Sequence, residues 1–151
     1  IMGPLKSISA RAATLARHIE AEDTLAAVVE YENGALGVIQ AATSVYPGYP
    51  RRLEINGEKG SIILEEDVLV RWDAEEQPSC VINRGDARKK SCRDPGEIGA
   101  AGHIEQYKNF IGAVQGGEAL LVDDREGRKT LEIIMKAYEA ARMKKTVYFN
   151  E

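Results

Sequence analysis

Cysteine and histidine are both scarce in this chain, which has two of each among its 151 residues. Cys80 and Cys92 are too few for a disulfide scaffold, and their spacing matches no zinc or redox motif. His18, Glu20 and Glu22 alternate along a segment that we expect to be extended, so they could share one face, but a solvated strand edge is the expected role there. We therefore expect no metal site, and a reducing, cytoplasmic environment.

Long apolar runs and an excess of positive charge are also missing. No apolar run approaches the roughly 20 residues that cross a bilayer, so we expect no membrane segment. The net charge of −4 gives no reason to expect nucleic-acid binding. The length and the 44% hydrophobic content suit one domain with a core of its own.

The motifs of self-sufficient enzymes are absent from the sequence. No glycine-rich GxGxxG turn follows a strand, no P-loop is present, and no Ser-His-Asp or Cys-His arrangement stands out. We therefore expect neither catalytic nor cofactor-binding residues in this chain. It starts with Ile1 and leads at once into strand-like sequence, so we expect residues 1–151 to be one domain of a longer polypeptide.

Two hairpin signals dominate what is present. Asn33-Gly34 lies between two apolar runs, and both turn residues of such a hairpin must accept a positive φ. Asn56 to Gly60 is a longer glycine-bearing turn between two further runs. Hairpins join antiparallel neighbours, which predicts a mainly antiparallel sheet. The expected strands are 5–16, 24–31, 35–43, 52–55, 61–64, 68–72, 80–82 and 146–149.

Two helices are expected in the second half, after a loop over 83–102 that is rich in glycine and poor in apolar residues. Apolar residues recur at helical spacing from Ile104 to Val114, and a second helix begins near Asp123 with Glu126 three residues later, a capping-box pattern. The order of elements predicts an α+β domain: an open, mostly antiparallel sheet with helices packed on one face. The apolar stripe of the second helix is Leu131, Ile134, Ala137, Tyr138 and Ala141.

Five residues are candidates for contact with a substrate. Tyr46, Tyr49, Arg51 and Arg52 lie in the connection between the hairpins, where tyrosine rings suit sugars or polyols and arginines suit carboxylates and phosphates. His103 stands where the long loop meets the first helix and could donate a hydrogen bond or transfer a proton. The alternative for the first four is turn packing with solvated arginines, and for His103 a solvated helix start.

Several motifs occur in the order found in one known family. They are Met2 to Ile8, Glu22-Asp23-Thr24 with Tyr31 to Ala35, Leu53 to Ile62, Gly102-His103 with Phe110-Ile111, and Val122 to Leu131. On these motifs, which together cover nearly the whole chain, the sequence resembles the C-terminal domain of the Gfo/Idh/MocA oxidoreductases. Glucose–fructose oxidoreductase and inositol dehydrogenase are members of that family.

The resemblance implies a two-domain enzyme whose N-terminal Rossmann domain, absent from this chain, binds NAD or NADP. The implied reaction is hydride transfer between the nicotinamide and a sugar, a polyol or a derivative. The family's catalytic lysine and Asp/His pair have no counterparts here. The resemblance also implies that His103 lies near the substrate cleft, that residues 46–52 lie at the rim of the sheet, and that the sheet's exposed face forms a homo-oligomer contact.

Two other functions are compatible with the sequence. One is a non-catalytic module for assembly, and the other is a stand-alone ligand-binding α+β protein without a Rossmann partner. An upstream reading frame that encodes the dinucleotide domain and its lysine would argue against both.

Overall fold

The computed structural model describes residues 2–66, 68–75, 77–81 and 101–149. The chain forms two compact units, one made of Ile1–Ser44 with Ala101–Glu151 and the other of Val45–Ala100. The first unit therefore consists of two separate stretches of sequence, and the second unit is inserted between them. Most of the long loop expected over 83–102 lies outside the described residues.

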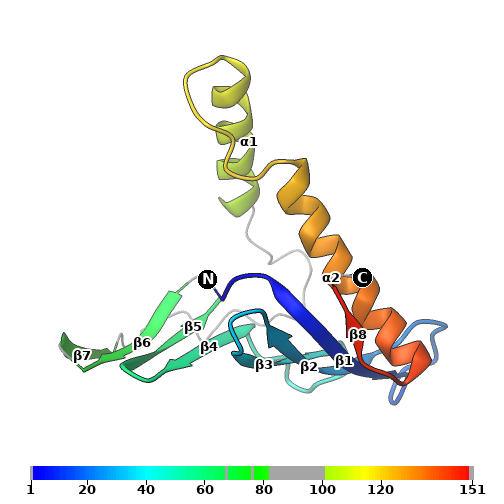
Figure 1. Ribbon diagram of the computed structural model, residues 1–151. Helices are drawn as coiled ribbons and strands as arrows, with labels where there is room; N and C mark the ends of the chain where they lie inside the picture. Colours follow the sequence, from blue (N-terminus) through cyan, green and yellow to red (C-terminus); the bar gives the residue numbers. More distant parts are fainter. Residues whose placement is uncertain (1, 67, 76, 82–100, 150–151) are drawn as a thin grey trace. The chain divides into compact units, whose positions relative to one another are not determined.

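The sheet of the first unit has the order β3-β2-β1-β8, with every pair antiparallel. Its strands are β1 (Leu5–Ala13), β2 (Thr24–Tyr31), β3 (Leu36–Ala42) and β8 (Val147–Tyr148) (Figure 1). The Asn33-Gly34 turn joins β2 to β3 as expected, with Gly34 at a φ of 85°. The Asn33 side chain fixes this turn by accepting from the Ala35 amide at 3.0 Å.

The core of this unit lies between one face of the sheet and helix α2 (Asp124–Met143). Ile8 and Val29 are opposite each other in register, and both are almost completely buried. Alanines on the helix let it approach the sheet closely, because a small side chain keeps the two backbones near each other. The buried apolar residues of the described chain are Ile8, Ala10, Ala27, Val29, Ala137 and Ala140.

Helix α2 begins where its sequence predicts and ends at Met143. The Asp123 side chain caps the helix by accepting from the Glu126 amide at 2.9 Å, and Lys144 adopts the left-handed conformation at the C-terminal end. The predicted apolar stripe is buried only in part. Ala137 lies in the core, whereas Leu131, Ile134 and Tyr138 are 56%, 47% and 47% exposed.

Helix α1 (Ala101–Val114) contains no buried residue among its described side chains. The segment after it is fixed by Asn109, whose side chain donates to the carbonyl of Ala119 at 2.9 Å and accepts from the Leu121 amide at 2.9 Å. Gly116, at a φ of 76°, makes the turn that ends the helix.

The second unit is a four-stranded antiparallel sheet with the order β4-β5-β6-β7. Its strands are β4 (Arg52–Gly57), β5 (Gly60–Glu65), β6 (Val68–Ala74) and β7 (Gln77–Val81). The α+β class is confirmed, and the described strands form two sheets where the sequence suggested one. The reason is that the strands of each unit pair only with one another, and no turn signal reveals where such a division falls.

Asp23 organises the loop between β1 and β2. Its carboxylate is 2% exposed and accepts backbone N–H bonds from Leu15, Ala16 and Arg17 at 2.9, 2.8 and 2.9 Å. The Thr24 hydroxyl adds a fourth bond at 2.9 Å. These donors hold the pKa of Asp23 well below its usual range, with the Leu15 amide as the largest cause.

The expected extended segment around His18 is therefore wrong, because residues 14–22 follow the irregular path that Asp23 imposes. Glu22 accepts a hydrogen bond from the Tyr138 hydroxyl, which ties this loop to α2. This bond lowers the pKa of Glu22 and raises that of Tyr138. Glu22 therefore has a structural role in the described chain.

Candidate functional site

The connection that leads into β4 carries the two candidate tyrosines. Tyr46 is 79% exposed and Tyr49 is 73% exposed, so both rings are presented to solvent. The Tyr46–Pro47 peptide bond is cis, and Gly48 takes a φ of 87°, which favours glycine at this position. Two exposed aromatic rings three residues apart provide flat apolar surfaces with hydroxyl groups, which suit the faces and edges of a sugar ring.

The two candidate arginines are paired with carboxylates. Arg52 lies 2.8 Å from Glu54 and 3.3 Å from Glu65, and the hydrogen bond to Glu54 is the largest cause of its raised pKa. Arg51 lies 3.4 Å from Glu66. Exposed pairs of this kind contribute little stability, so both guanidinium groups can exchange partners at low cost. An anionic ligand would nevertheless compete with these acidic residues for the arginines.

The strand register explains why Arg52 pairs with two carboxylates. Arg52 is directly opposite Glu65 across the β4–β5 pair, and Glu54 lies two residues further along the same strand. Side chains two apart in a strand share a face, so these three groups form a polar face of the second sheet. The opposite face is apolar and carries Leu53, Ile55, Ile62, Leu64 and Trp72.

His103 is the third residue of α1, and its side chain is exposed. It belongs to the first unit, whereas Tyr46, Tyr49, Arg51 and Arg52 belong to the second or stand at its start. The tyrosines and arginines are thus held together by one short segment of chain. The substrate-facing role of His103 stays a prediction of its own.

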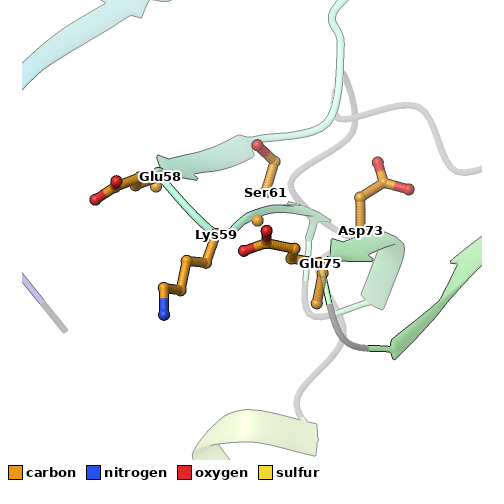
Figure 2. Close-up of a pocket in the computed structure, with 8 residues that line it drawn as sticks. Glu58, Lys59, Ser61, Asp73 and Glu75 are labelled. Carbon is orange, nitrogen blue, oxygen red and sulfur yellow. The ribbon is translucent and has the colours of Figure 1, made fainter.

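An open hollow of about 490 Å³ lies at the β4–β5 turn, where the sequence predicts only a glycine-bearing hairpin turn. It is formed by residues 57–61 and 73–75 (Figure 2). Figure 2 shows Glu58, Lys59 and Asp73 pointing in different directions, so these charged groups do not converge on a common point. Gly57 and Gly60 mark this turn in the sequence. Glycines also occur where two backbones pack closely, so they do not by themselves predict a hollow.

The described residues supply neither a metal site nor a dinucleotide site. Within them, no three His, Cys, Asp or Glu side chains are grouped so that they could hold a metal ion. The strand pairs found in this part of the chain are all antiparallel, whereas the dinucleotide fold needs parallel strands joined by a helix. NAD or NADP therefore does not fit these residues, and no hydride step is assigned to them. No described helix is both long and apolar enough to span a bilayer.

Antiparallel sheets, one of them covered by a long capped helix, define an α+β domain. Residues 1–149 match the Gfo/Idh/MocA family described as "Oxidoreductase family, C-terminal alpha/beta domain". The chain belongs to this family, as the sequence motifs suggested.

Several proteins similar to this chain are dehydrogenases. Myo-inositol 2-dehydrogenase of Thermotoga maritima is 28% identical over 132 residues, which are 85% of this chain and 37% of that protein. The WlbA dehydrogenase of Bordetella pertussis, solved in complex with NADH and UDP-GlcNAcA, is 29% identical with a TM-score of 0.77 over 99% of this chain and 41% of its own.

The WlbA dehydrogenase of Chromobacterium violaceum, solved with the same two molecules, is 31% identical with a TM-score of 0.77. This match covers 98% of the present chain and 41% of that one. The chain thus spans about two fifths of the length of these relatives.

Proposed function

We propose that this chain is the substrate-binding and assembly domain of an NAD(P)-dependent oxidoreductase that acts on a sugar, a polyol or a derivative of one. The observation that carries the proposal is the match along essentially the whole chain to dehydrogenases solved with NADH and a nucleotide sugar. In the proposed enzyme, residues 1–151 are one domain and a Rossmann domain supplies the dinucleotide site and the catalytic lysine. The protein works in the cytoplasm.

The substrate-facing role is assigned to His103 and to the segment with Tyr46, Tyr49, Arg51 and Arg52. The exposed rings of Tyr46 and Tyr49 support this role, because each offers an apolar face on which a sugar ring can stack. The arginines serve a substrate that bears a carboxylate or phosphate, since such a group can replace Glu66 or Glu54 as their partner. His103 donates a hydrogen bond to a substrate hydroxyl.

Substitutions at Tyr49 and His103 in the full-length polypeptide test the substrate-facing role. Tyr49→Ala and His103→Ala are each expected to lower kcat/KM about tenfold, the loss of one stacking contact or hydrogen bond. Tyr49→Phe keeps the ring and is the matched control. Steady-state kinetics with a panel of sugars, polyols and nucleotide sugars measures the effect, and NADH affinity should stay unchanged. Unaltered kcat/KM in both alanine variants would show that Tyr49 and His103 do not contact the substrate.

The assembly role is assigned to the outer face of the first sheet. Val28 and Val38 are opposite each other in register and are 53% and 79% exposed, and Leu36, two residues from Val38, is 74% exposed. An apolar sheet face open to water is a feature of interaction surfaces. We assign it to a second copy of the chain.

A charge placed on this face should break the assembly. Val38→Glu is expected to reduce the mass of the full-length protein in solution to that of the monomer, because a carboxylate would be desolvated at the interface. Val38→Thr, which keeps the shape of the side chain, is the control and should weaken assembly far less. Light scattering after gel filtration measures the mass. A wild-type protein that is monomeric at every concentration would contradict the assignment.

The second candidate is a non-catalytic module used for assembly alone. The charge-paired arginines favour it, since Arg52 already has two carboxylate partners. NADH titration of the full-length polypeptide separates the two functions, because only the oxidoreductase binds the dinucleotide.

A further inference from the structure

Helix α1 buries none of its described apolar side chains. It has 14 residues, and each described apolar side chain on it that is larger than alanine is about half exposed or more. Isolated helices of this length are marginal in water, so α1 needs a surface to pack against. The exposed residues are Ile104 at 49%, Tyr107 at 69%, Phe110 at 56%, Ile111 at 53% and Val114 at 72%.

These side chains share one stripe of the helix surface, and His103 belongs to the same stripe. Successive residues turn by about 100°, so positions i, i+4, i+7 and i+11 lie along one face. His103, Tyr107, Phe110 and Val114 have this spacing, and Ile104 and Ile111 lie beside them. We call these six residues the α1 stripe.

The α1 stripe contains no acidic residue, lysine or arginine. The charged pair of this helix, Glu105 and Lys108, lies on another side, with 2.7 Å between the carboxylate and the ammonium group. Charged residues are depleted at the buried centre of interfaces, and a half-exposed aromatic and aliphatic surface is typical of an interface whose partner is absent. The stripe is therefore suited to an apolar protein surface.

We propose that the α1 stripe docks against an apolar surface of the dinucleotide-binding domain of the same polypeptide. This inference rests on the proposed function. Its support is that the chain spans only 41% of each WlbA relative, so those proteins contain a large part with no counterpart here. A second copy suits the stripe less well, because a helix pair in water is usually specified by charges that flank its apolar seam, and the assembly role is already assigned to the sheet.

Docking of the α1 stripe also assigns a place to His103. It is the only basic side chain of the stripe, and it lies in the first turn of the helix. Burial of the apolar residues that follow would hold the imidazole at the margin of the interface, where it faces the domain that carries the dinucleotide. The interface would thus position His103, while the helix itself contributes packing.

Hydrogen exchange of the full-length polypeptide, measured by mass spectrometry over residues 104–114, tests the docking. The wild-type amides are expected to exchange at least tenfold more slowly than those of Phe110→Glu and Tyr107→Glu, at all protein concentrations. Gln106→Glu adds the same carboxylate outside the stripe and should keep the wild-type rates. If the glutamate variants do not fold, the exchange rates of the wild-type amides alone still show whether the α1 stripe is covered.

Two results would overturn the docking. Fast exchange of these amides in the wild-type protein would show an uncovered helix, and protection that falls on dilution would show that a second copy covers it. NADH titration of the same sample keeps the two proposals apart. A protein that binds NADH but leaves α1 unprotected refutes the docking alone, and one that does not bind NADH refutes the proposed function.

Discussion

Replacing Asp23 by alanine is expected to lower the melting temperature by about 10 °C, because four hydrogen-bond donors lose one shared acceptor. Three of them are the successive backbone amides of Leu15, Ala16 and Arg17, and the fourth is the Thr24 hydroxyl. The site is almost completely buried, so water cannot replace the carboxylate without opening the loop. Calorimetry or circular dichroism measures the shift.

Glu20→Ala is the matched control for Asp23→Ala, since it removes an exposed carboxylate from the same loop. Its melting temperature should stay within about 2 °C of the wild type, as for other surface substitutions. Equal shifts in the two variants would show that the backbone amides do not depend on Asp23.

The same carboxylate should make stability depend on pH. The pKa of Asp23 in the folded protein lies below its ordinary value of 3.8, so the folded state binds this proton less readily than the unfolded state. Its contribution is therefore present above about pH 4 and is lost as the pH falls below that value towards the folded-state pKa. Asp23→Asn does not titrate, and its melting temperature should fall less steeply between pH 5 and 3.

Replacing Gly60 by valine is expected to destabilise the second unit by about 2–3 kcal/mol, the usual cost of forcing atoms into a packed site. A Cβ at this position would lie 2.4 Å from the carbonyl oxygen of Asp73 and 3.1 Å from the Cα of Ala74. Both are backbone atoms of β6, so the β5–β6 ladder itself must shift. Denaturant unfolding measures the loss.

Gly57 offers a matched control in the same turn. Its added Cβ would meet only the Gly60 carbonyl oxygen, at 3.4 Å, which is close to ordinary contact. Gly57→Ala should therefore cost less than about 1 kcal/mol, the scale of a glycine-to-alanine change in an unstrained strand. A Gly60→Val variant as stable as Gly57→Ala would show that the two strands can separate freely there.

The elements that the sequence predicts well are those fixed by neighbouring residues. The strand over 24–31, the Asn33-Gly34 turn and the Asp123 cap all depend on chemistry within a few positions, and the structure confirms each of them. The division of the strands between two sheets was not predicted. It depends on pairings such as β1 with β8, between opposite ends of the chain, which leave no local signal.

Candidate residues were harder to judge from the sequence. The pattern in α1 shows correctly that one face is apolar, but periodicity does not indicate what covers that face. The pairing of Arg52 with Glu54 and Glu65 follows from register, which becomes known only when the strands are placed. The role of Asp23 could not be predicted, because nothing in its sequence context marks the three amides that converge on it.

The split of the first unit into two stretches of sequence has a consequence for synthesis on the ribosome. Strand β8, near the end of the chain, completes the sheet by pairing with β1, near its start. The strand pairs described in the inserted second unit join strands that follow one another in the sequence, so this unit can fold while translation continues. In the first unit, β8 and α2 leave the ribosome after residues 45–100, so until then the edge of β1 lacks its β8 partner and the core face of the sheet lacks its covering helix.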